Sequence, residues 1–237
     1  MLEISHFTKC YKAGVPAVDD LSLKVKPGEI CGFIGHNGAG KSTTLKAVAG
    51  ILDFSDGDIR IGGDSIRENP VACKRRMAYV PDNPDLYEYL TGIRYLNFIA
   101  DIYRVDADAR TKAIGEYAEA FEMTERLGEA IGGYSHGMKQ KLALIGALLH
   151  DSQLYILDEP FVGLDPKATF TIKEILRERC ERGAAVFFST HVLEVAEKLC
   201  SSVVIIRGGR LVAAGETASV VRDKSLEDVF LALTEEK

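Results

Sequence analysis

The feature that most constrains this chain is a glycine-rich segment at residues 35–43. Its sequence, Gly-His-Asn-Gly-Ala-Gly-Lys-Ser-Thr, fits the pattern GxxxxGK[ST]. The apolar run at residues 30–34 before it predicts a buried parallel strand, and the segment after it is expected to be a helix. Glycines let backbone N–H groups turn toward phosphate oxygens, and a helix N-terminus adds its positive dipole end. The chain is therefore expected to hold a nucleotide on a phosphate-binding loop (P-loop).

Individual residues of this loop have separate expected tasks. Lys41 is predicted to place a point charge on the phosphates, and Ser42 to ligate Mg²⁺ through its hydroxyl group. A chance glycine-rich turn is the competing explanation, which the strand-then-helix context makes rare. The residues expected to bind ATP here are Gly35, Asn37, Gly38, Ala39, Gly40, Lys41, Ser42 and Thr43.

A second segment, at residues 154–160, ends an apolar run with two adjacent carboxylates, Asp158 and Glu159. A buried strand would deliver them to the carboxyl edge of the sheet, where ligands bind in open α/β folds. Asp158 is predicted to hold Mg²⁺, directly or through water, and Glu159 to orient and deprotonate an attacking water. A strand end that meets a solvated loop is the alternative, which a neighbouring P-loop disfavours.

The first sixty residues predict short strands joined by turns, and strands alternate with helices over most of the remaining chain. Further apolar strands are predicted at residues 185–188 and 203–206, with helices near 167–181 and 192–199. This alternation predicts an α/β fold with a parallel sheet and right-handed crossovers. Apolar residues recur at helical spacing between about 83 and 150, with Thr91 as an expected N-cap. We expect one domain over 1–237, with its core at about 1–82 and 151–237 and this helical block inserted.

At these motifs the chain resembles the nucleotide-binding domain family of ABC transporters, over essentially its whole length. The resemblance implies a P-loop NTPase parallel-sheet core, an N-terminal antiparallel β subdomain and an α-helical signature subdomain. Tyr-Ser-His-Gly-Met-Lys-Gln at residues 134–140 stands where the family has its LSGGQ-type signature. Ser135 and Gly137 match, whereas Tyr134, His136 and Met138 depart. In the family this motif contacts the γ-phosphate held by the opposite subunit; an ordinary helix N-cap is the alternative role for Ser135.

Shorter matches follow the family's order. Asp165, in Gly-Leu-Asp-Pro, resembles the D-loop residue that communicates across the dimer; a turn and helix start, with Asp165 as N-cap before Pro166, is the alternative. His191 resembles the switch histidine that contacts the γ-phosphate, which implies a catalytic set of Glu159, His191 and Lys41.

Tyr11 resembles the aromatic residue that stacks on adenine, although an edge-strand tyrosine is the alternative. Asp82 stands where the family has a glutamine near Mg²⁺; the shorter carboxylate is expected to reach the metal through water.

The resemblance also implies partners and a location. The family's subunits sandwich two ATP molecules in a dimer, so a homodimer or a heterodimer with a related subunit is expected. They drive a separate transmembrane permease from the cytoplasmic face of the cell membrane. The resemblance implies that the aromatic segment at residues 86–90 borders the cleft for that partner; packing within the helical block is the alternative. Residues 225–231 resemble the tail of ABC-2-type exporter ATPases, which favours export; an ordinary amphipathic end helix is the alternative explanation.

Other functions are weighed against this hypothesis. The net charge of -6 disfavours a nucleic-acid partner, because a non-specific grip needs a basic face. A GTPase would carry Asn-Lys-x-Asp, which the sequence lacks. Two alternatives stay open: a non-transport ABC-type ATPase that acts as a mechanical or regulatory module, and a weakly hydrolysing half of a heterodimer, as the departures at Asp82 and His136 allow.

Overall fold

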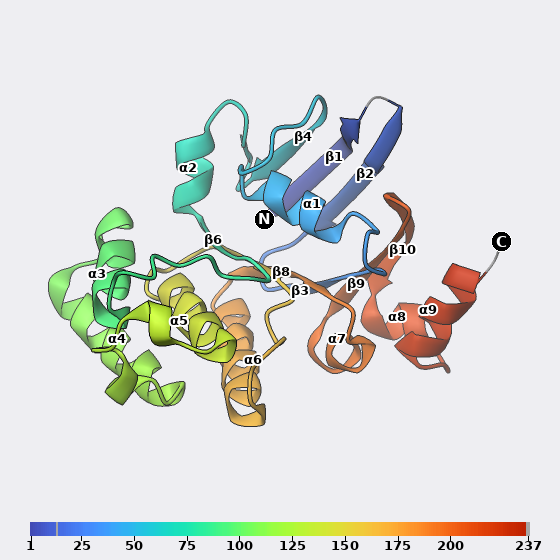
Figure 1. The fold of residues 1–237 in the computed structure, drawn as a ribbon. Helices are drawn as coiled ribbons and strands as arrows, with labels where there is room; N and C mark the ends of the chain where they lie inside the picture. Colours follow the sequence, from blue (N-terminus) through green and yellow to red (C-terminus); the bar gives the residue numbers. More distant parts are fainter. Residues whose placement is uncertain (13, 236–237) are drawn as a thin grey trace.

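The computed structural model describes residues 1–12 and 14–235 and contains two β-sheets (Figure 1). The first is antiparallel, in the order β2-β1-β4-β5. Its strands are β1 (Leu2–Lys12), β2 (Val15–Val25), β4 (Asp56–Ile61) and β5 (Asp64–Ser65). The second has the order β10-β9-β3-β8-β7-β6 and is parallel except for β10, which pairs antiparallel with β9. Its strands are β3 (Ile30–Ile34), β6 (Met77–Val80), β7 (Leu154–Asp158), β8 (Ala185–Thr190), β9 (Ser202–Arg207) and β10 (Arg210–Glu216).

The helices of the described residues surround the second sheet. They are α1 (Lys41–Val48), α2 (Pro70–Arg75), α3 (Gly92–Ile102), α4 (Ala107–Ala120), α5 (His136–Leu148), α6 (Pro166–Glu181), α7 (Leu193–Leu199), α8 (Thr217–Val221) and α9 (Leu226–Glu235), with 3₁₀ turns at Thr124–Arg126 and Ile131–Gly133. This order confirms the predicted α/β class with an antiparallel N-terminal sheet and a parallel core. None of these helices is long and apolar enough to cross a membrane.

The helix α1 lies between the two sheets and defines one of the two cores (Figure 1). Phe7 from the antiparallel sheet, Leu45 from α1 and Phe33 from β3 are all completely buried there. Burial of side chains this size stabilises the fold by about 1.5–3 kcal/mol each. Because β3 enters the P-loop and α1 leaves it, this core holds both ends of the loop.

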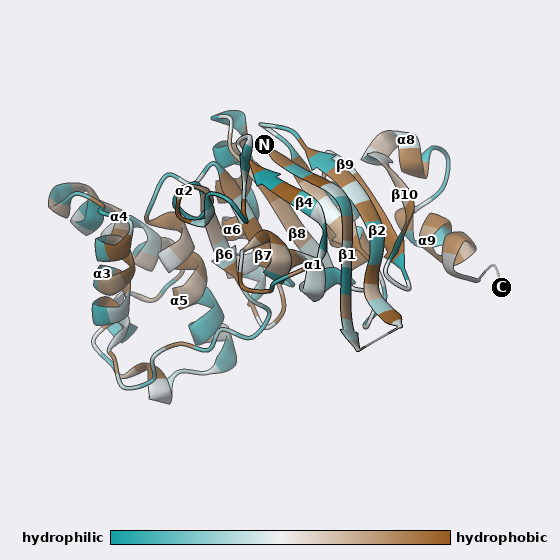
Figure 2. Ribbon diagram, turned by 90° about the horizontal axis from the view of Figure 1, so that it is seen from above, coloured by the Kyte–Doolittle hydropathy of each residue, from teal (hydrophilic) through white to brown (hydrophobic). Residues whose placement is uncertain are grey.

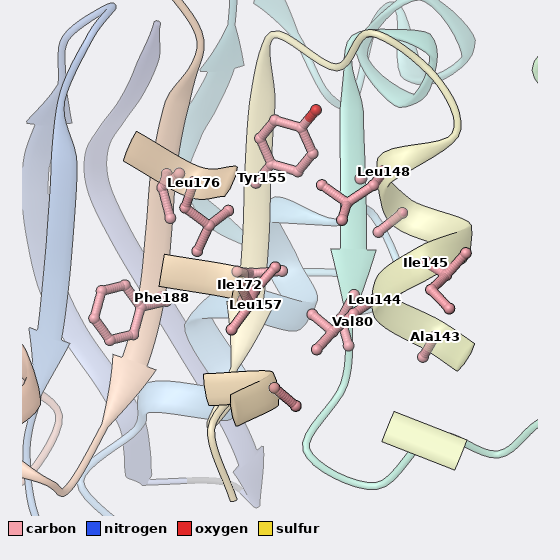
Figure 3. Close-up of a cluster of buried hydrophobic side chains, with 14 of the residues drawn as sticks. Val80, Ala143, Leu144, Ile145, Leu148, Tyr155, Leu157, Ile172, Leu176 and Phe188 are labelled. Atoms are coloured by element: carbon pink, nitrogen blue, oxygen red, sulfur yellow. The ribbon is translucent and has the colours of Figure 1, made fainter. Parts of the chain in front are cut away.

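The second core lies on the other face of the parallel sheet, between its strands and α5 and α6 (Figure 3). Both faces of the central strands are therefore covered, which explains why β3, β7 and β8 are apolar runs without alternation. The labelled side chains that meet in this core are Val80, Ala143, Leu144, Ile145, Leu148, Tyr155, Leu157, Ile172, Leu176 and Phe188.

Helices α3, α4 and α5 extend beyond β6, the edge strand, while α8 and α9 lie at the opposite end of the molecule (Figure 2). Thr91 caps α3 as expected, because its side chain accepts a hydrogen bond from the backbone N–H of Arg94. Met77, at the start of β6, ties this helical block to the sheet. Its carbonyl oxygen contacts the Tyr103 hydroxyl and His150 Nε2, each at 3.3 Å, and the two rings stack with centroids 3.5 Å apart.

Two parts of the fold differ from the pattern-based expectation. The first strands are eleven residues each, not short, because bulges break their alternation where His6 and Asp20 adopt positive φ angles. The six-residue helix α2 was not predicted, since it is too short to show helical periodicity and its clearest local signal is Pro70 at the first turn.

Candidate nucleotide-binding site

The P-loop is a closed turn held by its own lysine. Lys41 is only 6% exposed, and its Nζ donates to the carbonyl oxygens of Gly35 at 2.6 Å and His36 at 3.3 Å. Gly40 has φ +105°, and a Cβ there would meet the Ala17 carbonyl oxygen at 2.6 Å. Only glycine fits this position, so the tight loop predicted from the sequence has a steric basis.

A cavity of about 210 Å³ opens over this loop. Its lining contains most of the predicted loop residues and two acidic side chains from elsewhere in the chain. The lining residues are Ala17, His36, Asn37, Gly38, Gly40, Lys41, Ser42, Thr43, Asp82 and Glu159. Gly35 and Ala39 are buried beneath the loop. The exposed Tyr11 reaches its rim, where its hydroxyl lies 3.3 Å from Thr43 Oγ1.

The two consecutive carboxylates sit at the carboxyl end of β7. Asp158 is 2% exposed, and its Oδ1 accepts a hydrogen bond of 2.5 Å from the Ser189 hydroxyl. The same hydroxyl oxygen accepts the backbone N–H of Glu159 at 3.0 Å. Glu159 adopts φ +49°, a conformation that is strained for a side chain and is held here by these contacts. Ser189 therefore fixes both acidic residues.

Sequence patterns alone gave Ser189 no role of its own. The available signal was a hydroxyl residue at the end of the apolar strand β8, two positions before His191. Parallel pairing places Ser189 beside Asp158 in the register of β7 and β8. Ser189 therefore supports the carboxylates because β8 pairs with β7.

Glu159 lies between two nitrogen groups. Its Oε1 is 3.8 Å from Lys41 Nζ, and its Oε2 is 3.0 Å from His191 Nδ1 and accepts the His191 backbone N–H at 3.3 Å. The Glu159 side chain is 12% exposed and that of His191 55% exposed. The three residues predicted to be catalytic thus meet in one cluster at the cavity, with the carboxylate in the centre.

The acidic and hydroxyl groups also fit a magnesium ion that arrives with a nucleotide. Ser42 and Asp82 line the cavity, and Asp158 stands at the adjoining strand end. No cluster of three or more His, Cys, Asp or Glu side chains with metal-binding geometry occurs in the part of the chain that the structure describes. In proteins, Mg²⁺ is usually held by one or two carboxylates together with waters and substrate phosphates.

The signature segment lies apart from this cavity, whose lining contains neither Ser135 nor Gly137. Ser135 caps α5, and its Oγ accepts the Met138 backbone N–H at 3.3 Å. Gly137 packs so closely that a Cβ would meet the Gly163 carbonyl oxygen at 2.5 Å. His136 lies against the same glycine, because a Cβ on Gly163 would stand 2.7 Å from the His136 ring.

Asp165, in the predicted D-loop, caps α6. Its carboxylate accepts the Ala168 backbone N–H at 2.8 Å and lies 2.6 Å from Lys141 Nζ. The hydrogen bond from Lys141, followed by that from the Ala168 amide, lowers the pKa of Asp165 below its usual value. The lysine belongs to α5, so the D-loop and the signature helix are tied together within one chain.

Known proteins are similar to this chain in sequence and in fold. Residues 18–162 match the family model described as "ABC transporter". The chain is 35% identical to the ABC-type transporter ATP-binding protein EcsA of Bacillus subtilis (strain 168), covering 100% of this chain and 97% of that protein. It is 33% identical to the SkfA peptide export ATP-binding protein SkfE of the same organism, covering 89% and 87%.

A solved ATP-binding subunit of an ABC transporter superimposes with a TM-score of 0.95 at 35% identity, covering 99% of this chain and 100% of that one. The P-loop cavity, the carboxylates at the end of β7 and these similarities agree with one another. The chain belongs to the ABC transporter family, in which it is an ATP-binding subunit and an ATPase.

Proposed function

We propose that this subunit works as an ATP-driven clamp, in which two such chains close around two nucleotides. The observation that carries the proposal is the separation of the P-loop cavity from the signature residues, of which Ser135 is exposed and Gly137 half-buried. A helix N-terminus with free backbone N–H groups suits a phosphate. The signature of a second chain, either a copy or a related subunit, would therefore complete the cavity of the first, and Asp165 would lie near that junction.

Within each cavity, the residues act on ATP in separate ways. Lys41 stabilises the charge on the β- and γ-phosphates, and the loop amides orient them for in-line attack. Glu159 takes the proton of the attacking water, while His191 holds the carboxylate in position. Tyr11 stacks on the adenine ring. Ser42, Asp158 and, through water, Asp82 would hold Mg²⁺, which would neutralise charge on the phosphate oxygens.

The proposed permease partner docks beside the helical block. A groove of about 490 Å³ lies there, lined by Ala49, Ile51, Val71, Lys74, Arg75, Met77, Tyr79, Ile102, Tyr103 and Arg104. The neighbouring rings of Tyr87, Tyr89 and Phe98 are 48%, 80% and 40% exposed. Exposed aromatic clusters of this kind are typical of protein interfaces. Docking at this surface places the chain at the cytoplasmic face of the membrane.

Two finer points belong to the same proposal. The core at about 1–82 and 151–237 and the helical block at about 83–150 act as parts of one domain, since the clamp needs the signature and the P-loop on one chain. The direction of transport is export, supported by the tail at residues 225–231 and by similarity to a relative named for peptide export.

The test is purification of the tagged chain from detergent-solubilised membranes of its native host. A multi-span membrane protein should accompany the wild type and be lost from a Tyr89→Glu variant whose ATPase activity in isolation is unchanged. Phe170→Glu is a matched control, because Phe170 is 66% exposed on α6, away from the groove. Recovery of ribosomes in place of a membrane protein would contradict the transport partner and favour a non-transport role.

A further inference from the structure

The C-terminal helix α9 contacts the nucleotide site from outside. It lies with α7 and α8 at the end of the sheet away from α3–α5 (Figures 1 and 2). Phe230 of this helix is 6% exposed, and its ring centroid lies 4.7 Å from that of His36 at an interplanar angle of 58°. His36 is the second residue of the P-loop and lines the cavity above it. A side chain close to the end of the chain therefore supports the loop that binds phosphate.

Other contacts fix α9 in place independently of this ring pair. The Leu226 backbone N–H donates to Glu197 of α7 at 2.7 Å, and Arg207, at the end of β9, donates to the Leu233 carbonyl oxygen at 3.2 Å. Ser225 and Asp228 form reciprocal hydrogen bonds at the start of the helix. Phe230 is therefore presented to His36 by a helix anchored at both ends.

The position of His36 matters to the loop because its carbonyl oxygen has two partners. It accepts Lys41 Nζ at 3.3 Å and the Ala39 backbone N–H at 3.1 Å. From another side, the Gly209 backbone N–H donates to the Ala39 carbonyl oxygen at 3.0 Å. A shift of His36 would move the carbonyl oxygen to which Lys41 donates, and with it the turn from His36 to Ala39.

We propose that Phe230 is a positioning residue for nucleotide binding, and that α9 holds the P-loop in its ATP-binding shape through His36. Docking of α9 and binding of ATP are then coupled, and the coupling is reciprocal: the helix strengthens ATP binding and ATP strengthens docking of the helix. The proposal rests on the proposed role of the P-loop residues and is independent of the dimer and of the permease.

The first experiment measures the Kd of Mg-ATP and the steady-state kinetics of a Phe230→Leu variant, which keeps an apolar side chain and loses the ring. The Kd and the KM should rise about three- to tenfold, with kcat at saturating ATP within about twofold of wild type. Val229→Ala, on the same helix but facing the pocket beside α8 and β10, is the matched control and should bind as wild type. Unchanged affinity in a folded Phe230→Leu protein would overturn the proposal.

A double-mutant cycle then tests whether the effect passes through His36. In a His36→Ala background, Phe230→Leu should add no further loss of affinity, whereas independent effects would multiply and contradict the coupling. Lys41→Ala serves as the reference for the loop itself. If Lys41→Ala binds ATP as well as wild type, the proposed role of the P-loop fails and this inference fails with it. If Lys41→Ala loses affinity and Phe230→Leu does not, only this inference fails.

Hydrogen exchange gives the reciprocal readout. Backbone amides of residues 226–235 should exchange more slowly when Mg-ATP is added to the wild type, and the slowing should vanish in Phe230→Leu. If residues 226–235 exchange at the same rate with and without nucleotide while the amides of α1 are slowed, or if they slow equally in wild type and Phe230→Leu, the coupling is overturned.

Discussion

The cavity over the P-loop and the signature surface at the start of α5 belong to one chain but are built in opposite ways. At the cavity, Lys41 and Glu159 in its lining and Asp158 at the adjoining strand end are largely buried, and each contacts another residue of the same chain. At the signature, Ser135 is exposed and its hydroxyl caps its own helix. The chemical groups are thus assembled before a nucleotide arrives, while the signature is presented outward.

This difference shows which steps one chain can perform alone. Binding of ATP requires only groups that the chain already holds together, whereas the proposed closure requires a surface from another chain. Variants in the two regions should therefore separate binding, chemistry and closure.

Glu159→Gln should have the largest effect. It removes the base between Lys41 and His191 while preserving the size of the side chain. Turnover should fall by roughly a hundredfold or more with ATP affinity within a few-fold of wild type, as measured by phosphate release and by equilibrium binding. Steady-state hydrolysis near the wild-type rate would remove Glu159 from the role of base.

Gly137→Ala should damage the signature surface and spare the cavity. The new Cβ would stand 2.5 Å from the Gly163 carbonyl oxygen, so the start of α5 must shift. Turnover should fall by roughly tenfold to a hundredfold while ATP binding is kept. Gly115→Ala is the control, since a Cβ there has open space.

Mixing variants sharpens the same comparison. Gly137→Ala chains have an intact cavity and Lys41→Ala chains an intact signature, so a mixture should recover about a quarter of wild-type activity if the sites are shared between two chains. Activity of the mixture equal to the sum of the two separate variants would contradict a shared site.

Ser189→Ala should have a smaller effect on chemistry. It removes the hydroxyl that donates to Asp158 and accepts from the Glu159 amide. A lost hydrogen bond to a charged group is worth about 1.5–3 kcal/mol, so turnover should fall about tenfold to a hundredfold. Ser202→Ala, a buried serine at the start of β9, should stay within about twofold in the same phosphate-release assay.

The smallest effect concerns His150, which contacts Met77 where the helical block meets the sheet. Burial lowers the pKa of His150 to about 4. The unfolded chain takes up this proton near pH 6.5 and the folded one only near pH 4, so stability is present above pH 6.5 and decreases as the pH falls toward 4. Urea unfolding should show a loss of about 1–2 kcal/mol from His150 between pH 7 and 5. A His150→Gln variant with the same pH slope would contradict this assignment.

The sequence predicted the parts of the fold and site whose causes are local. The P-loop, the carboxylates after β7 and the caps Thr91 and Asp165 each follow from short patterns of residue types. The expected strand-helix alternation follows from the same patterns.

The remaining features depend on residues that are distant in sequence. Ser189 supports the carboxylates only because β8 pairs with β7, and Phe230 reaches His36 only because α9 packs beside α7. The bulges at His6 and Asp20 likewise depend on the pairing of two strands. Sequence patterns report residue composition and spacing, whereas these features arise from the pairing of strands and the packing of helices that are distant in sequence.

The central claim is that two chains close around ATP, and the most direct test is the mass of Glu159→Gln protein by light scattering. We expect a dimer in Mg-ATP that returns to a monomer in Mg-ADP, because the bound γ-phosphate joins the cavity of one chain to the signature of the other. A monomer in both nucleotides, with ATP binding confirmed separately, would contradict closure of two copies of this chain.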